Sequence, residues 1–394
     1  MKKRAGVFIK IFICILLIII LTGCWNRREL DTLGIVMGIG VDKPQEPGKI
    51  KLTAQVVKPG EIKSSKKEGG GGSGSDAYLN IEDTGDTVFS TLRDMTNLSS
   101  RKLFFPHNQV LIIGRSIAEE GVRKYVDFFT RDPETRNNVW VLVAQETAGE
   151  VLDVGAQLEK IPASNISKIV EGEAAATSQT LAVRLSDFLE RLMSKTTAPV
   201  APIIRVSGEG DKKIAAITGT AVFKDDKLVG KLDKSEGRGL LWILGKVKSG
   251  IINVEGPQND KVSLEIIHAQ SKLAPEIKGS EITMKIAVSE EGNIGEEMGT
   301  EDLSMLSEIE ILEQRKTEVI RNEIMAAVKK AQELNADIFG LGDAVHKKYP
   351  KQWKSMESNW DEIFPNIKVE VKIEAKLRLM GRINKPAAPE QEKK

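Results

Sequence analysis

Cysteine and histidine are the side chains best suited to nucleophilic or metal chemistry, and this chain has few of them. It holds two cysteines, Cys14 and Cys24, and three histidines, His107, His268 and His346. The histidines stand far apart, and no two have the His-x-x-x-His spacing that places two metal ligands on one helix face. There is also no G-x-S-x-G segment that would expose a nucleophilic serine. We therefore predict no catalytic residue, no metal site and no bound cofactor.

Cys24 follows a segment with the layout of a secretory signal. Residues 2–4 are basic, residues 11–21 are apolar without a break, and the small residues Thr22 and Gly23 stand directly before the cysteine. By the positive-inside rule the basic end stays cytoplasmic. Everything after Cys24 is then expected to be exported.

The segment 21–24 (LTGC) resembles the lipobox of bacterial lipoproteins. In that family the thiol is alkylated by a diacylglycerol, the signal is cut before the cysteine, and the new amine can be acylated. Two or more acyl chains hold a protein stably at a membrane, whereas one chain gives marginal binding. The resemblance predicts that residues 1–23 are a cleaved signal and that Cys24 is the lipidation site. The alternative is an uncleaved apolar segment that happens to end in cysteine.

Glycine-rich stretches raise the question of phosphate binding. Gly38 and Gly40 lack the third glycine of a dinucleotide motif, because Lys43 stands in its place. The run 69–74 (GGGGSG) lacks the Gly-Lys-Ser/Thr that completes a P-loop, and the segment 340–342 (GLG) predicts a break between helices. None of the three has the context that nucleotide motifs require.

The charge balance argues against nucleic acid as a partner. The chain has 57 basic and 56 acidic residues, for a net charge of +1. A nucleic-acid-binding domain is expected to show a basic stripe or patch, and none stands out. The densest charged cluster is 131–136 (RDPETR), either a docking patch or a loop whose opposite charges pair. We favour the loop.

Alternating strands and helices predict a mixed N-terminal domain over residues 24–202. Strands are expected at 35–41, 50–57, 110–113 and 139–144, and helices after Asp86 and at 117–129, 149–158 and 186–193. Composition predicts a flexible loop at 63–76 (KSSKKEGGGGSGSD). The alternation is typical of an α and β domain.

Two further domains are predicted after Pro202. Residues 203–275 are rich in β patterns, with a hairpin over 214–232, a short helix at 236–246 and a strand at 262–269. Residues 276–384 combine a strand at 282–288, a long helix at 302–334, shorter helices over 337–360 and a closing strand at 368–379. The closing strand alternates strictly, as a strand with one wet face does in an antiparallel sheet.

The predicted fold class is therefore α+β. We expect three mixed α and β domains with antiparallel-rich sheets and packed helices, after a cleaved lipoprotein signal. Residues 385–394 are expected to form a disordered tail, because they are charged and have little to bury.

The stretch after Cys24 resembles a known family. Residues 25–30 (WNRREL), 33–36 (LGIV) and 38–42 (GIGVD) are similar to the mature start of the Ger(x)C spore germination lipoproteins. Further matches follow in the order of the family: 106–107 (PH) before 110–114, 127–132 (DFFTRD) with Arg136, 219–224 (GTAVFK), 228–232 (LVGKL), 237–242 (GRGLLW), 336–340 (ADIFG), Trp353 and Trp360.

The resemblance implies the third subunit of a nutrient germinant receptor. Its partners would be the membrane lipid and two integral membrane subunits, of A-type and B-type, with no nucleic acid. It would sit lipid-anchored on the outer leaflet of the spore inner membrane, and the family is not credited with catalysis. Only Cys24 is carried over as a site; the other matching residues are interpreted as fold-defining.

Two other functions stay open at this point. A solute-binding lipoprotein that captures a small nutrient would need a concave pocket with convergent polar groups. An envelope hydrolase would need a pair of carboxylates in a cleft, and no diagnostic arrangement of carboxylates is evident. The leading hypothesis is the lipid-anchored, non-enzymatic receptor subunit.

Overall fold

The computed structural model describes residues 32–62, 76–155, 158–279, 281–299, 303 and 305–379. The predicted signal 1–23, the lipidation site Cys24 and the predicted tail 385–394 lie outside the described residues. So does nearly all of the predicted loop 63–76.

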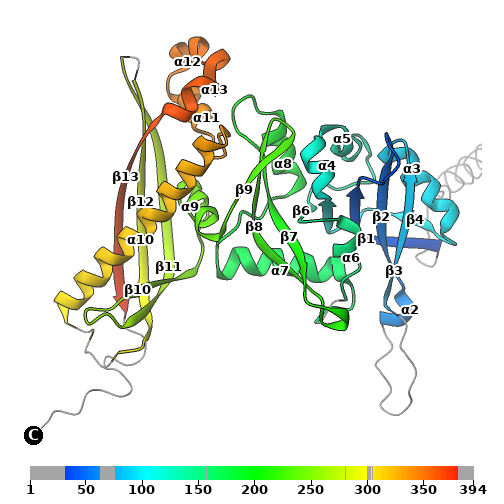
Figure 1. The fold of residues 1–394 in the computed structure, drawn as a ribbon, viewed down its shortest axis with the longest axis horizontal. Coiled ribbons are helices and arrows are strands. Elements are labelled where there is room, and N and C mark those ends of the chain that lie inside the picture. Colours follow the sequence, from blue (N-terminus) through cyan, green and yellow to red (C-terminus); the bar gives the residue numbers. More distant parts are fainter. Residues whose placement is uncertain are drawn as a thin grey trace, which may run out of the picture.

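Nine strands of the described residues form one mixed sheet, which spreads from the blue to the green part of the ribbon in Figure 1. The order is β3-β2-β1-β5-β6-β7-β8-β9, and β4 pairs with β1. The neighbours β1, β5, β6 and β7 run parallel, while β2 and β3 on one flank and β8 and β9 on the other pair antiparallel. The bounds are β1 (Leu33–Asp42), β2 (Ile50–Val57), β3 (Tyr78–Gly85), β4 (Lys102–Phe104), β5 (Val110–Ile113), β6 (Trp140–Ala144), β7 (Val200–Ser207), β8 (Ile214–Lys224) and β9 (Lys227–Leu232).

Helices cover the parallel centre of this sheet on both faces. In β5, Val110 and Ile112 belong to a core built with α6 and α7, whereas Leu111 and Ile113 belong to a core built with α4, α5 and α8. Parallel strands covered on both faces are expected to be apolar without alternation, and β5 is buried at all four positions. The helices before the second sheet are α2 (Pro59–Ile62), α3 (Val88–Asp94), α4 (Arg115–Glu120), α5 (Arg123–Arg131), α6 (Ala148–Leu152), α7 (Pro162–Ala176), α8 (Leu185–Met193) and α9 (Lys234–Leu244).

A second sheet of four strands has the order β10-β11-β12-β13 in the described residues. The long helix α10 crosses one face of it, and α9 packs against α10 at the junction with the first sheet (Figure 1). Three short helices follow α10 at one end of the sheet. The bounds are β10 (Gly250–Glu255), β11 (Lys261–Lys278), β12 (Glu281–Glu297), α10 (Leu306–Glu333), α11 (Leu341–Lys348), α12 (Pro350–Met356), α13 (Trp360–Ile363) and β13 (Lys368–Leu379).

The closing strand forms where it was predicted, but its expected antiparallel pairing is wrong. β13 pairs with β12 in parallel, with Val371 opposite Ile286. Its alternation has another cause: α10 lies against one face of the strand, where Ala375 is buried, while Lys372 and Glu374 stay exposed on the other. Alternation reports coverage of a single face and carries no information about strand direction.

Besides the helix expected at 149–158, which ends at Leu152 as α6, two helices depart from the sequence prediction. The helix expected at 117–129 is split into α4 and α5 at Gly121, whose φ is +130°, a conformation that L side chains rarely adopt. A Cβ at Gly121 would also lie 2.8 Å from Asp226 Oδ2. The second departure is α7, for which no helix was predicted. Its buried residues share one face, but the proline, serine and alanine among them make the apolar pattern of the sequence weak: Pro162, Ala163, Ile166, Ser167 and Val170.

The sheets group the strands differently from the predicted three domains. Residue 202 lies inside β7 and residue 275 inside β11. Strands β8 and β9 of the 203–275 range continue the first sheet, and β10 and β11 begin the second. The division into three domains therefore stays a prediction.

Candidate functional site

The residues singled out for catalysis or metal binding do not come together. His107 packs beside Phe104 with ring centroids 5.7 Å apart, His268 Nε2 lies 2.9 Å from the Gln270 amide, and His346 stacks on Trp353. Among the described residues no group of three or more His, Cys, Asp or Glu side chains has an arrangement that could hold a metal ion. Cys24 lies outside the described residues, so the structure does not test it.

The cluster 131–136 was interpreted as a loop whose opposite charges pair with each other, and this is wrong, because its ion pairs are with residues outside the cluster. Arg131 forms a bidentate ion pair with Asp127, at 2.7 and 3.2 Å, and this contact lowers the pKa of the Asp127 carboxyl. The Asp132 carboxylate accepts from the backbone amide of Glu134 at 2.8 Å. Glu134 in turn lies 3.9 Å from Lys102.

The glycines at 38 and 40 serve helix packing. A Cβ on Gly38 would lie 2.8 Å from Leu152 and from Ala163, which belong to the helices covering β1. Asp42, at the end of β1, accepts from the amides of Ala148 and Gly149 at 2.8 and 2.9 Å, at the first turn of α6. Burial raises the pKa of Asp42, against the lowering effect of these two hydrogen bonds. The segment 38–42 (GIGVD) therefore positions α6. Its backbone lies in the sheet between β2 and β5, so its amides are not arranged to bind a phosphate.

The GRGLLW segment, residues 237–242, holds α9 against α10 through a buried carboxylate. Glu323 of α10 accepts from Arg238 Nε at 2.9 and 3.0 Å, from Arg238 Nη2, and from Trp242 Nε1 at 2.9 Å. The Arg238 and Glu323 side chains are only 10% and 6% exposed. Gly239 allows the close approach, because a Cβ there would lie 2.0 Å from the Glu323 carbonyl oxygen. This segment therefore defines the fold at the junction of the two sheets.

A second buried ion pair joins α10 to β12. Lys316 Nζ donates to Glu290 Oε1 at 2.6 Å, and both side chains are fully buried. Glu290 Oε2 has no hydrogen-bond partner among the described residues. Burial raises the pKa of Glu290 to about 6, because the single contact with Lys316 only partly offsets desolvation.

The ADIFG segment, residues 336–340, turns the chain after α10 around a buried carboxylate. Asp337 accepts from the amides of Leu341 and Gly342 at 2.9 and 2.8 Å, and from Trp360 Nε1 at 3.3 Å. Burial raises the pKa of Asp337 to about 6. Gly340 has φ +74° at the N-cap of α11. A break between helices was predicted at 340–342, but it lies earlier in the chain, since α10 ends at Glu333 and α11 already begins at Leu341.

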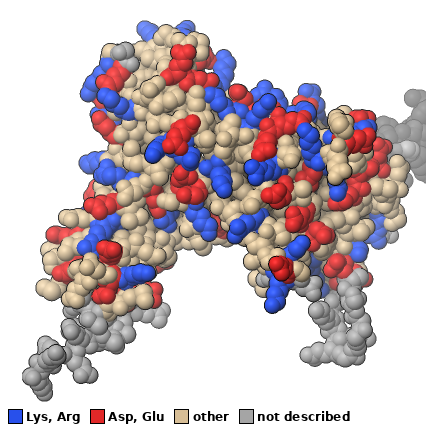
Figure 2. Space-filling model, in the orientation of Figure 1, with Lys and Arg blue, Asp and Glu red and all other residues tan. Residues whose placement is uncertain are grey.

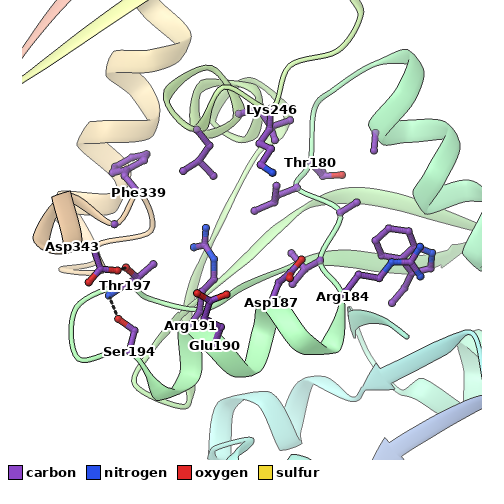
Figure 3. Close-up of a pocket in the computed structure, with 18 of the residues that line it drawn as sticks. Thr180, Arg184, Asp187, Glu190, Arg191, Ser194, Thr197, Lys246, Phe339 and Asp343 are labelled. Atoms are coloured by element: carbon purple, nitrogen blue, oxygen red, sulfur yellow. Dashed lines mark hydrogen bonds between the residues drawn. The ribbon is translucent and has the colours of Figure 1, made fainter. Parts of the chain in front are cut away.

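A cleft of about 780 Å³ lies where this turn meets α8 and α9 (Figure 3). Its walls come from segments 171–197, 241–248 and 339–347, with Trp140 at one side. Small-molecule sites have volumes of roughly 300–1,000 Å³ and often lie where separate structural units meet. The volume and place of this cleft are therefore those of a ligand site.

Arg191 is the half-buried cation in the floor of the cleft. Its Nη1 donates to the carbonyl oxygens of Ala198 and Ile338, at 3.1 and 3.0 Å. Burial lowers the pKa of the Arg191 guanidinium, which nevertheless stays charged at neutral pH. No carboxylate of the described residues pairs with it within 4.0 Å. The guanidinium is thus positioned by backbone groups and keeps donors for another partner.

The other charged groups of the cleft divide into paired and unpaired sets. The Asp343 carboxylate accepts from the hydroxyls of Thr196 and Thr197 at 3.0 and 2.7 Å. Arg184 lies 3.2 Å from the centroid of the Trp140 ring and 3.8 Å from Glu171. Within the described part of the chain, the groups without an ion pair are Arg191, Lys246, Lys248, Lys347, Asp187, Glu190 and Asp343.

Reasoning from the sequence missed this cleft. Arg191, Lys246 and Lys347 have no motif around them, and only folding brings their segments together. Asp337 was noted as part of a family match, without its role in the turn.

The face of the molecule seen in Figure 2 carries charges of both signs. In Figure 2 basic and acidic side chains alternate over the visible face of both sheets. Among the described helices none is both long and apolar enough to cross a membrane.

Comparisons with known proteins agree along the whole chain. A family described as "Spore germination protein N-terminal domain" matches residues 26–206, and one described as "Spore germination B3/ GerAC like, C-terminal" matches residues 218–381. The chain is 30% identical to "Spore germination protein KC" of Bacillus subtilis over 392 residues, covering 94% of this chain and 95% of that protein. It is 26% identical to "Spore germination protein YndF" of the same organism, covering 95% and 96%.

A solved structure supports the same fold. The crystal structure of the GerBC protein matches with a TM-score of 0.57 and 17% identity, covering 89% of this chain and 99% of that one. The α+β class predicted from the sequence is confirmed by this match. The two family models together match most of the chain, and the relative at 30% identity covers 94% of it. The chain therefore belongs to the Ger(x)C family of spore germination proteins.

Proposed function

We propose that this chain is the lipid-anchored, non-catalytic third subunit of a nutrient germinant receptor. It would be held by Cys24 on the outer leaflet of the spore inner membrane, beside integral membrane subunits of A-type and B-type. It would support the response that starts germination when nutrients arrive. The observation that carries the proposal is the match to spore germination proteins over nearly the whole chain.

Anchoring is supported by the sequence around Cys24. A basic start, an apolar run and small residues precede the cysteine. A thioether-linked diacylglycerol alone supplies two acyl chains, which is enough for stable attachment. A lipid anchor would hold the folded part close to the membrane, because Thr32, the first described residue, stands eight positions after Cys24.

The test replaces Cys24 with alanine in spores that carry the variant as their only copy. We expect the protein to lose incorporated labelled palmitate and to leave the membrane fraction. Germination on nutrients, followed by the fall in optical density, should be impaired. Cys14→Ala is the matched control, because it removes the other cysteine from within the predicted signal and should change neither result.

The fractionation is done in cells without the partner subunits, so that only the anchor can hold the protein at the membrane. A Cys24→Ala protein that still carries palmitate would contradict the lipidation. Normal germination with unlipidated protein would contradict the need for the anchor. The partners are tested separately, by crosslinking in membranes and co-purification with the A-type and B-type subunits.

The second function, capture of a small solute, is favoured by one specific observation, the cleft around Arg191. The two functions are compatible, since a receptor subunit can also bind a ligand. The envelope hydrolase has no such observation in its favour.

A further inference from the structure

The cleft beside α8 contains more positive than negative charge that lacks a partner. Four cations of its walls have no ion pair within the described residues, Arg191, Lys246, Lys248 and Lys347, against the three acids Asp187, Glu190 and Asp343. Arg191 is the most shielded of the four cations, since the three lysines are exposed. No carboxylate of the described residues lies within 4.0 Å of Arg191, although four more distant acids act on its charge: Asp337, Asp187, Glu190 and Asp343. A bound anion in direct contact with the guanidinium would add a charge-assisted hydrogen bond.

The geometry of Arg191 suits an oxyanion. Its Nη1 is committed to two backbone carbonyls, which hold the guanidinium in one orientation, at 3.1 Å from Ala198 O and 3.0 Å from Ile338 O. The Nε and Nη2 groups remain as donors on the same rigid plane. Two parallel N–H donors match the two oxygens of a carboxylate or phosphate.

A second cation faces Arg191 across the cleft. Figure 3 shows the Arg191 and Lys246 side chains reaching into the same space from opposite walls, one from α8 and one from the segment after α9. An anion in this space would be attracted by both charges. Since α8 packs on the first sheet and Lys246 follows the helix that packs on α10, such a ligand would bridge the two halves of the molecule.

Part of the cleft wall is apolar. Leu241, Leu244 and Phe339 line it together with the charged groups. Leu241 and Phe339 are already only 3% and 5% exposed, so the partly exposed Leu244 is the apolar side chain that a ligand with a hydrocarbon body would cover. The Asp343 carboxylate accepts from two threonine hydroxyls but keeps its charge, so a ligand anion must lie nearer to the cations than to Asp343.

We propose that this cleft binds a small organic oxyanion, with its carboxylate or phosphate between Arg191 and Lys246 and an apolar body against Leu244. The proposal adds a ligand site to the receptor subunit. The ligand site does not depend on Cys24. If the lipid anchor is disproved, the ligand site can still be tested, and the reverse also holds.

The binding test uses three probes of nearly the same shape. Benzoate carries a carboxylate, phenyl phosphate carries a phosphate, and benzamide is the neutral counterpart of benzoate. The full-length protein in detergent is titrated with each at low ionic strength and followed by ligand-observed NMR, because exposed charges are screened within about 10 Å at 0.1 M salt. We expect benzoate or phenyl phosphate to bind and benzamide to bind at least tenfold more weakly. The ratio of the dissociation constants of benzoate and phenyl phosphate shows whether the site prefers a carboxylate or a phosphate of the kind found on lipid headgroups.

Variants locate the site. Lys246→Gln should raise the dissociation constant of the anion that binds more tightly by about tenfold, because a charge-assisted hydrogen bond is lost. Lys351→Gln is the matched control, because Lys351 is an exposed lysine of α12 outside the cleft and should leave the constant unchanged. Asp187→Asn should strengthen binding of an anion by a few-fold, and it would weaken binding of a cation.

The proposal is overturned if benzamide binds as well as both anions. It is also overturned if Lys246→Gln and Asp187→Asn leave the dissociation constants unchanged. All three substitutions are at exposed positions, so a folded variant is expected in each case, and circular dichroism confirms it before titration.

Discussion

Replacing Glu323 with glutamine tests whether the buried carboxylate between α9 and α10 stabilises the fold. The substitution keeps the shape of the side chain but removes its charge. Arg238, whose side chain is 10% exposed, would then lie buried without a counter-ion. In the native protein both Arg238 and Trp242 donate to carboxylate oxygens of Glu323. In the variant the NH₂ group of the new glutamine would face one of these donors and could not accept its hydrogen bond.

The expected cost follows from the geometry. Removing one partner of a buried ion pair costs about 3–5 kcal/mol, because the remaining charge has lost its compensation. For domains of 150–250 residues, each kcal/mol lowers Tm by about 2–4 °C. We therefore expect Glu323→Gln to lower Tm by on the order of 10 °C, measured by circular dichroism and by tryptophan fluorescence.

The control makes the same chemical change on the same helix. Glu333 lies on α10 with an exposed side chain, 3.3 Å from Lys330 and 4.0 Å from Lys329. Surface pairs contribute about 0–1 kcal/mol, so Glu333→Gln should shift Tm by no more than about 2–4 °C. Equal shifts for the two variants would refute the role of Glu323. In the double variant R238M/E323Q the loss should be smaller than the sum of the single losses, because each single change breaks the same interaction.

Two further predictions concern the packing of α6 and the turn after α10. Gly38→Val should lower the free energy of unfolding by at least about 1–3 kcal/mol in urea, because its Cβ would lie 2.8 Å from Leu152 and Ala163, whereas Gly60→Ala, with nothing within 4 Å, should be nearly neutral. The raised pKa of Asp337, about 6, means that the folded state holds this proton more tightly than the unfolded state, whose pKa is near 3.8. The stability of the native protein relative to Asp337→Asn should therefore fall, by at most about 3 kcal/mol, as pH rises from about 4 to about 6, and then level off; a difference that rises over this window would contradict the assignment. Glu290 and Asp42 titrate in both proteins, so their effects cancel in the difference.

Local signals in the sequence were enough to locate many elements. The helix predicted at 236–246 is α9, Lys234–Leu244, and its N-terminus is closed by a capping box between Asp233 and Glu236. That box has a readable pattern, an N-cap acceptor followed three residues later by glutamate. Where a structural cause lies within a few residues, a single sequence carries it.

Pairings between distant segments could not be predicted in this way. Nothing in residues 368–379 shows that β13 runs parallel to β12, because both directions bury the same alternate side chains. The insertion of β5 and β6 between β1 and β7 likewise depends on which helices cover which face. Strand order and direction are properties of contacts across the chain, and one sequence does not display them.

The charged residues of this protein fall into two groups that a sequence cannot separate. Arg238, Glu323, Lys316 and Glu290 are buried and paired across the chain, so their replacement should change stability. Lys246, by contrast, is exposed and unpaired among the described residues, so its replacement should change binding and leave Tm nearly unaltered. Both Arg191 and Lys246 lie within the ranges that the two family models match, but the short segments that carried the resemblance in the sequence include Arg238 and neither of them. Resemblance therefore identified the part of the chain that builds the fold, and only the folded arrangement identified the groups free to meet a ligand.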